Sequence, residues 1–286
     1  MRRQILSVFK IILYIVLSLL LVILIRLFLC NFYTVSSNSM EPTILSGDFI
    51  LTDKYTYGAR IFNSLTFDRN SDPSMIHTPG VRHIRRNDVV VFNYPYRTNW
   101  DTIRMNLEKI FIKRCIGLPG DSISAISGYY LISGFADTLG YIPEQKQLAR
   151  YRSTLDSSII RTVAFDESLY WDVFDFGPFY IPSAGATIAL SLENFKFYHK
   201  QIVYETRADV RLKDSLVYIN DTLRHEYKFS TNWYFMVGDN AKNSQDSRYI
   251  GLIPEDYIIG KASFVITSKD RNLGKKRWNR ILKRIK

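Results

Sequence analysis

A run of apolar residues near the N-terminus limits how this chain of 286 residues can fold. Residues 11–29 contain a single charge, Arg26, which lies near one end of the run and can reach the lipid headgroups from there. A helix over these residues is about 28 Å long, close to the hydrocarbon thickness of a bilayer. We therefore expect residues 1–30 to form a short N-terminal segment followed by one transmembrane helix.

The basic residues before this run predict its orientation. Arg2, Arg3 and Lys10 precede it, so the positive-inside rule places the N-terminus in the cytoplasm and the rest of the chain outside. A cleaved signal peptide would have small residues after the apolar run, but residues 30–33 are Cys-Asn-Phe-Tyr. A lipoprotein would have a small residue before the cysteine, where this chain has Leu29. We expect a retained single-pass anchor.

The formal net charge of +11 is concentrated at the two ends of the chain. Residues 1–30 hold four Lys or Arg and residues 271–286 hold eight, with no Asp or Glu in either segment. Removing these 12 bases from 38 leaves 26 against 27 acids, so the middle of the chain is about neutral. A nucleic-acid-binding body would need a basic face. We expect no nucleic acid partner, and the basic ends suit a membrane lipid surface.

The cysteines and histidines give no sign of a disulfide framework or a metal site. Cys30 and Cys115 are far apart and have no ligand-like spacing, so we expect two free thiols. His77 and His83 are expected to be exposed loop residues, because no third ligand lies at a useful spacing. We expect neither a metal nor another cofactor.

Short runs of β-branched and aromatic residues predict a mostly β fold. Residues 122–232 hold many such runs with weak helical periodicity, and we interpret them as an inserted β-rich lobe. The antiparallel β core is then expected from residues 31–121 and 233–270. Residues 60–87, broken by Pro and Gly, predict a long loop or hairpin. The clearest strands are expected at 32–35, 49–52, 88–92, 110–116, 129–132, 216–219, 234–237 and 258–267.

The last segment, residues 271–286, reads as a basic amphipathic tail. Its apolar residues Trp278, Ile281, Leu282 and Ile285 follow helical spacing, with Lys and Arg around them. Such a helix can lie flat on an anionic membrane surface. The alternative is a solvated basic tail.

A serine cluster at residues 36–39, Ser-Ser-Asn-Ser, directly follows the first expected strand. A serine nucleophile needs a base, yet none of the four histidines lies in a motif context and G-x-S-x-G is absent. Lys113 lies among apolar residues, with no acid closer than Glu108 or Asp121. Burial lowers the pKa of a lysine and can make it a base. Taken singly, the serines are turn formers and the lysine points to solvent.

Five segments, taken in order, resemble motifs of the bacterial type I signal peptidase (leader peptidase) family of Ser-Lys endopeptidases. Between them, residues 122–232 carry no such match. The segments are 37–44 (SNSMEPTI, against S-x-S-M-x-P-T-L), 47–54 (GDFILTDK, the strand box after it), 86–92 (RNDVVVF, with Asn87 where the family has glycine), 113–121 (KRCIGLPGD, against K-R-x-x-G-x-P-G-D) and 238–248 (GDNAKNSQDSR, against G-D-N-x-x-N-S-x-D-S-R).

The resemblance implies a role for each matching residue. Ser39 is then the nucleophile, Lys113 its general base, and Ser37 a hydroxyl donor to the oxyanion. The supporting residues are Ser244, which would hold the lysine amine, and Asp246 and Arg248, which would brace the site. Shallow pockets for alanine-sized side chains would be lined by Phe32, Val35 and Met40. The family usually has Arg-Asp where this chain has Ala241-Lys242, outside the inferred chemistry.

The implied function is that of a membrane-anchored serine endopeptidase. It would remove signal peptides from exported preproteins, cutting after small residues on the outer (periplasmic) side of the inner (plasma) membrane, and we expect it to be a monomer. A self-cleaving repressor with the same dyad is disfavoured because no DNA-binding domain precedes the serine box. An inactive anchored scaffold is disfavoured because Ser39 and Lys113 are both present.

Overall fold

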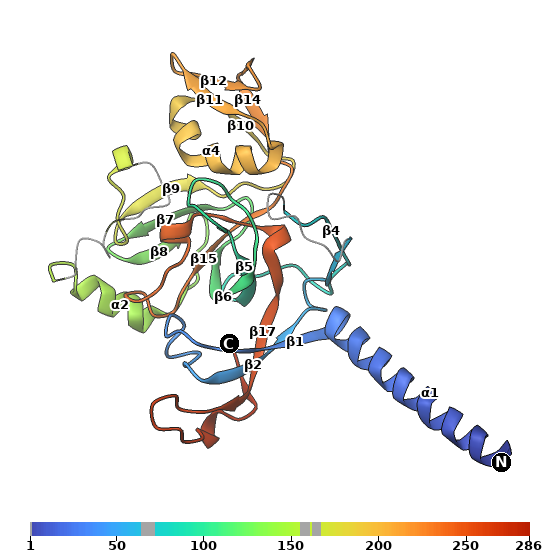
Figure 1. The fold of residues 1–286 in the computed structure, drawn as a ribbon. Coiled ribbons are helices and arrows are strands. Elements are labelled where there is room, and N and C mark those ends of the chain that lie inside the picture. The colour runs from blue at the N-terminus through green and yellow to red at the C-terminus, as the bar shows by residue number, and fades with distance from the viewer. Residues whose placement is uncertain (1, 64–71, 155–160, 162–166) are drawn as a thin grey trace.

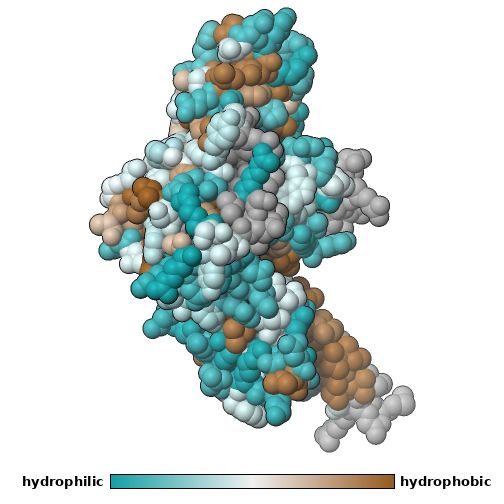
Figure 2. Space-filling model, turned by 90° about the vertical axis from the view of Figure 1, so that its left-hand side faces the viewer, coloured by the Kyte–Doolittle hydropathy of each residue, from teal (hydrophilic) through white to brown (hydrophobic). Residues whose placement is uncertain are grey.

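The computed structural model describes residues 2–63, 72–154, 161 and 167–286. An N-terminal helical rod leads away from a β-rich body, and a lobe with its own strands and helix α4 lies at the end of the body far from the rod (Figure 1). The rod consists of α1 (Arg2–Leu24) and a π-helical turn (Ile25–Leu29). Residues Ser7–Leu29 are long and apolar enough to cross a membrane, and none of that window is buried in the protein. The expected N-terminal helix is therefore present, and its apolar surface extends from the body as a brown rod (Figure 2).

The body is organised around an eight-stranded antiparallel sheet. Its strands follow the order β1-β2-β17-β5-β6-β15-β16, with β18 paired to β17. The expected antiparallel β core is confirmed. The bounds are β1 (Cys30–Thr34), β2 (Asp48–Asp53), β5 (Val89–Tyr94), β6 (Asn106–Gly117), β15 (Trp233–Val237), β16 (Ile253–Pro254), β17 (Ile258–Ser268) and β18 (Lys283–Arg284).

The central strand β5 is apolar along its length because both of its faces are buried. Successive strand residues point to opposite faces of a sheet. Val89 and Val91 pack into one hydrophobic cluster together with β2 and β17. Val90 and Phe92 pack into the larger cluster on the other face. Two cores thus sandwich the strand that pairs with β6, which carries Lys113.

The inserted lobe contains helices that the sequence analysis missed. Two helices, α2 (Ile142–Arg150) and α4 (Leu192–Thr206), lie among its strands, so the β-rich description is incomplete. In α4 the Ser191 side chain caps the first turn, and Tyr198 and Ile202 face the core four residues apart. The many aromatic residues of this segment resemble strand composition, which concealed the helix. Residues 155–160 and 162–166 of the lobe lie outside the described part.

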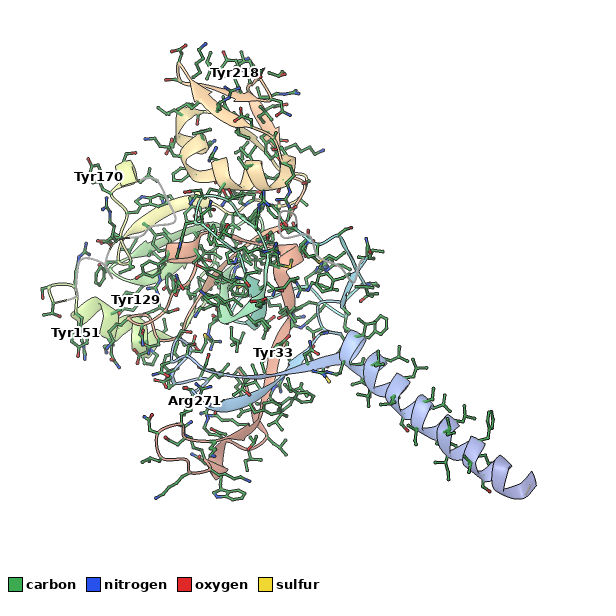
Figure 3. All side chains as sticks on the ribbon, in the orientation of Figure 1. Tyr33, Tyr129, Tyr151, Tyr170, Tyr218 and Arg271 are labelled. Atoms are coloured by element: carbon green, nitrogen blue, oxygen red, sulfur yellow. The ribbon has the colours of Figure 1, made fainter. Side chains whose placement is uncertain are left out.

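The strands of the lobe form three small antiparallel sheets. Their orders are β8-β7-β9, β10-β14 and β11-β12-β13. Tyr218 marks the outer end of the lobe in Figure 3, far from Tyr33 at the start of the body. The bounds are β7 (Ser122–Ile126), β8 (Tyr129–Ile132), β9 (Phe176–Tyr180), β10 (Thr187–Ala189), β11 (Val210–Lys213), β12 (Leu216–Ile219), β13 (Thr222–Arg224) and β14 (Glu226–Lys228).

The segment expected as a loop or hairpin at residues 60–87 contains a short hairpin. Its strands are β3 (Arg60–Phe62) and β4 (Met75–His77), which pair antiparallel. The tip at residues 64–71 lies outside the described residues. The short helix α5 (Ser247–Ile250) and three short 3-10 turns complete the described elements. The turns are Glu167–Leu169, Glu255–Tyr257 and Trp278–Arg280.

The prediction of an amphipathic helix in the tail is wrong. Over residues 271–286, all of which are described, the chain forms only a 3-10 turn at Trp278–Arg280 and the strand β18. Ile285 is buried, and Arg280 forms a buried ion pair of 2.5 Å with Asp48 beside the serine loop. Instead of forming a helix, the tail pairs with β17 through β18 and is held by this ion pair. Trp278 and Leu282 remain exposed.

Removal of the Arg280 charge should destabilise the protein. In Arg280→Met the Asp48 carboxylate stays buried without its cation, and breaking such a pair costs about 3–5 kcal/mol. Urea unfolding measures this as a lower free energy of unfolding. The matched control is Arg284→Met, because Arg284 is exposed on β18, and its change should stay within about 0.5 kcal/mol. Equal losses in the two variants would contradict a structural role for the ion pair.

Candidate active site

Two separate segments, β6 and the loop of residues 238–248, converge on the loop that follows β1. Lys113 lies in β6, opposite Val90 of β5. On the other side of β6, β15 pairs with it through Val237 and Arg114, and β15 leads into the loop of residues 238–248. Ser39 lies in the turn between β1 and β2. The sheet therefore brings together residues that are 74 positions apart in the sequence.

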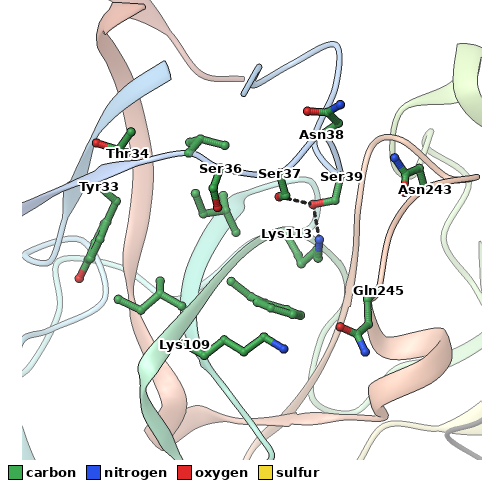
Figure 4. Close-up of a pocket in the computed structure, with 14 residues that line it drawn as sticks. Tyr33, Thr34, Ser36, Ser37, Asn38, Ser39, Lys109, Lys113, Asn243 and Gln245 are labelled. Carbon is green, nitrogen blue, oxygen red and sulfur yellow. Dashed lines mark hydrogen bonds between the residues drawn. The ribbon is translucent and has the colours of Figure 1, made fainter. Parts of the chain in front are cut away.

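The amine and the two serine hydroxyls form a short hydrogen-bonded chain (Figure 4). Lys113 Nζ donates to Ser39 Oγ over 2.5 Å, and Ser39 Oγ is 3.3 Å from Ser37 Oγ. Lys113 and Ser39 are both buried, with 3% and 8% of their surface exposed. A hydroxyl held against an amine in a largely dry site is the arrangement needed for a base-activated nucleophile.

Burial lowers the pKa of Lys113 to about 8. Desolvation is the largest cause, since an ammonium loses its hydration inside the protein. The Asp246 carboxylate raises the pKa, while the Arg248 guanidinium lowers it again. The charge of the Asp246 carboxylate is thus opposed by that of its own cation, and a fraction of the amine is neutral near neutral pH.

That carboxylate and cation form a fully buried ion pair. Arg248 Nη2 lies 2.8 Å from Asp246 Oδ2, and both side chains are completely buried. Burial alone would raise the pKa of Asp246, but the adjacent guanidinium outweighs it and the pKa is lowered. Asp246 also accepts a hydrogen bond from the Gly238 N–H and caps α5 (Ser247–Ile250). The pair therefore fixes the shape of the loop behind Lys113.

Ser244 is buried next to the loop that holds Ser39, but it does not contact Lys113 by a hydrogen bond. Its Oγ is buried and has no hydrogen-bond partner among the described residues. A Cβ on Gly238 would lie 2.1 Å from this Oγ and 2.5 Å from the Ser39 carbonyl oxygen. Only glycine fits at position 238, because any side chain would separate the two loops. Gly238 is a site residue that the sequence analysis did not single out.

Three further contacts of the same loop were also missed. The Asn240 N–H donates to the Ser39 carbonyl oxygen, and the Asn240 side chain donates to the Asn38 carbonyl oxygen. Arg114, next to Lys113, forms a buried ion pair of 2.6 Å with Asp239. These residues lie inside the quoted motifs, so the signal was present, but their partners depend on the tertiary structure.

A cleft of about 440 Å³ opens over Ser39. Val35 lines this cleft, whereas Phe32 and Met40 are not among its lining residues. Phe32 stacks on Phe49 on the outside of the sheet, and Met40 is buried in the smaller core. The described lining residues are Tyr33, Thr34, Val35, Ser36, Ser37, Asn38, Ser39, Lys109, Ile110, Phe111, Ile112, Lys113, Asn243 and Gln245.

The two positions that depart from the family motif join the active-site loop to the lobe. Ala241 is buried in a small cluster with Leu148 of α2 and Phe174. Lys242 donates to the Gln147 side chain over 3.1 Å, and its ammonium lies over the Tyr151 ring. Ala241 and Lys242 thus both contact the lobe, and the side chain of Lys242 forms its hydrogen bond with a residue of the lobe.

The sequence of most of the chain matches a protein family. The family described as signal peptidase, peptidase S26, matches residues 8–267. The chain therefore belongs to the signal peptidase family, peptidase S26, and is a serine peptidase, a hydrolase.

Individual relatives agree with this assignment. Signal peptidase I of Buchnera aphidicola subsp. Baizongia pistaciae (strain Bp) is 30% identical over 254 residues, covering 86% of this chain and 73% of that protein. Signal peptidase I of Aquifex aeolicus (strain VF5) is 30% identical over 270 residues, covering 93% and 84%. A solved signal peptidase I from Enterococcus faecalis V583 is 18% identical and covers 64% of this chain and 98% of that one. Its TM-score is 0.31, and we infer no feature of this chain from that superposition.

Proposed function

We propose that this protein is a membrane-anchored endopeptidase that removes signal peptides from exported preproteins through a Ser39–Lys113 dyad. The observation that carries the proposal is the 2.5 Å contact between Lys113 Nζ and Ser39 Oγ, made by a buried amine whose pKa is lowered to about 8. The relatives named above are signal peptidases I, which supports the substrate class.

In the proposed mechanism the neutral Lys113 amine takes the proton of Ser39 Oγ as that oxygen attacks the scissile carbonyl. The carbonyl oxygen gains negative charge in the tetrahedral intermediate. The lysine ammonium then gives its proton to the leaving amine, and the acyl-enzyme forms. Water then loses a proton to the same amine and attacks the acyl-enzyme. This step releases the signal peptide and restores Ser39.

The oxyanion needs hydrogen-bond donors on the side of Ser39 opposite the amine. Ser37 Oγ is 3.3 Å from Ser39 Oγ, which supports it as one donor. Within the described part of the chain the Ser39 N–H has no acceptor, so it is available as the second donor. One such donor is typically worth about 3 kcal/mol of barrier. Ser244, buried with an unpaired hydroxyl against the same loop, is proposed to position the amine when substrate binds.

We propose that the substrate binds in the cleft as an added β-strand beside residues 33–38. Val35 lines the cleft above Ser39 and is the proposed limit for alanine-sized side chains. The helical rod ends at Leu29 and β1 begins at Cys30 without a linker, which supports a cut made at a limited height above the bilayer. Lys54 Nζ donates to the Arg26 carbonyl oxygen over 2.7 Å and braces this junction.

The proposed setting is the inner (plasma) membrane, with the N-terminus in the cytoplasm, a single span, and the catalytic core on the outer side. Signal peptides and membrane lipid are the proposed partners, nucleic acid is not, and a monomer suffices because Ser39 and Lys113 come from one chain.

The dyad is tested by removing each member. Ser39→Ala and Lys113→Met should each lower preprotein cleavage at least about a thousandfold, because nucleophile and base act as a unit. The control is Ser133→Ala, which removes an exposed serine outside the cleft and should stay near wild type. Full activity in either dyad variant would end the assignment.

The pH dependence of cleavage should follow the Lys113 amine. The active form is the neutral amine, so kcat/KM should be low in acid, rise about tenfold per pH unit, and level off above a pKa of about 8. Near-UV circular dichroism over the same range controls for unfolding. A flat profile from about pH 6 to about 10, through the whole range between a depressed and an ordinary lysine pKa, would refute the proposed base.

Membrane contact by the tail is tested with a version that lacks residues 1–29. The exposed Trp278 and Leu282 lie beside basic residues, an arrangement suited to anionic lipid. Replacing both by Ser should weaken binding to phosphatidylglycerol vesicles by at least about fivefold in a flotation assay, because apolar area no longer leaves water. Leu216→Ser, at the far end of the lobe, is the control. Unchanged binding in the double variant would favour a solvated tail.

A further inference from the structure

We infer that Lys109 is a specificity-determining residue, whose ammonium makes the cleft favour an acidic side chain and disfavour a basic one close to the scissile bond. The inference rests on the proposed function, because it concerns the substrate of the same cleft. It goes beyond that function by adding a charge rule to the preference for small side chains.

The strand β6 places Lys109 beside the proposed catalytic base. Residues 109, 111 and 113 alternate along the strand, so their side chains leave the same face. Lys109 and Lys113 both line the cleft (Figure 4). The two amine nitrogens each lie 5.2 Å from the centroid of the Phe111 ring between them, so they are no more than about 10 Å apart.

Two aromatic rings hold the Lys109 ammonium in this position. Its nitrogen lies 3.9 Å from the centroid of the Tyr94 ring and 5.2 Å from that of Phe111. An ammonium near the face of an aromatic ring is attracted by the ring quadrupole. The side chain is exposed and would otherwise move freely in water. The charge therefore has a preferred place at the cleft, which a substrate side chain can meet.

The charge of Lys109 is not neutralised by the protein. Among the described residues that line the cleft, none is Asp or Glu. No ion pair or hydrogen bond joins the Lys109 amine to any part of the chain that the structure describes, and its three N–H donors remain available to a ligand. Lys113 acts in its neutral form in the proposed mechanism. Lys109 is then the one lasting charge of the described cleft lining.

The expected effect follows from distance and exposure. An extended substrate advances about 3.3 Å per residue, so a separation of about 10 Å covers positions within about three residues of the cut. A substrate carboxylate there gains an attraction and a lysine or arginine is repelled. Because the site is open to water, one charge should change kcat/KM only about two- to fivefold, and salt should reduce the effect.

The test uses the full-length protein in neutral detergent and a set of peptides with one cleavage site. Each peptide carries Glu, Gln or Lys at a single position, moved through three positions on either side of the cut. In wild type, at one or two adjacent positions, kcat/KM should fall in the order Glu, Gln, Lys. Lys109→Met should abolish this order, and Lys109→Glu should reverse it.

The control variant is Lys276→Met. Lys276 also has its amine near an aromatic ring, 5.3 Å from the centroid of Trp278, but it lies in the tail and does not line the cleft. It should keep the wild-type order, which separates a local effect from the change in net charge. Raising the NaCl concentration to about 0.5 M should shrink the wild-type ratios towards one.

The outcomes separate this inference from the proposed function. If wild type cleaves the Gln peptides and Ser39→Ala does not, the proposed function stands. The inference is then overturned if wild type shows no order at any position, or if Lys109→Glu leaves the order unchanged. If wild type cleaves neither the peptides nor a full preprotein, the proposed function fails and the inference fails with it. The wild-type order needs no variant, so misfolding of a variant cannot hide the result.

Discussion

The antiparallel pairing of β6 with β5 on one side and with β15 on the other is the constraint on which the site depends. It carries Lys113 into a sheet whose central strand is buried on both faces, and burial lowers the pKa of the amine to about 8. The same pairing delivers the loop of residues 238–248 behind the amine. A one-residue shift of β6 would turn Lys113 to the opposite face of the sheet.

Buried ion pairs hold the loops around this strand. Arg114 binds Asp239, Arg248 binds Asp246, and Arg280 binds Asp48 next to the serine loop. Each carboxylate near the amine is thus paired with its own guanidinium, so it does little to stabilise a charged lysine. Stability and chemistry are linked here, because the ion pair that shapes the loop behind Lys113 also opposes the rise in the amine pKa that the Asp246 carboxylate would cause.

Local sequence patterns were sufficient to predict the core strands, but they were insufficient to predict helix α4 and the structure of the tail. Runs such as residues 88–92 and 258–267 are rich in β-branched residues, and they form β5 and β17 nearly as predicted. The aromatic residues of α4 resemble a strand, and only its cap and its packing on the core make it a helix. In the tail, helical spacing predicted a helix. The observed structure is instead determined by strand pairing with β17 and by a buried ion pair with Asp48.

The sequence by itself determined the apolar span, the β-rich composition and the motifs that contain Ser39 and Lys113, because these features are local in the chain. Only the tertiary structure decided that the two side chains meet, that Ser244 has no hydrogen bond to the amine, and that Phe32 and Met40 lie outside the cleft. It also decided the placement of Lys109 on two rings. Distances, burial and charge compensation join residues far apart in the chain, so they arise only when the sheet is assembled.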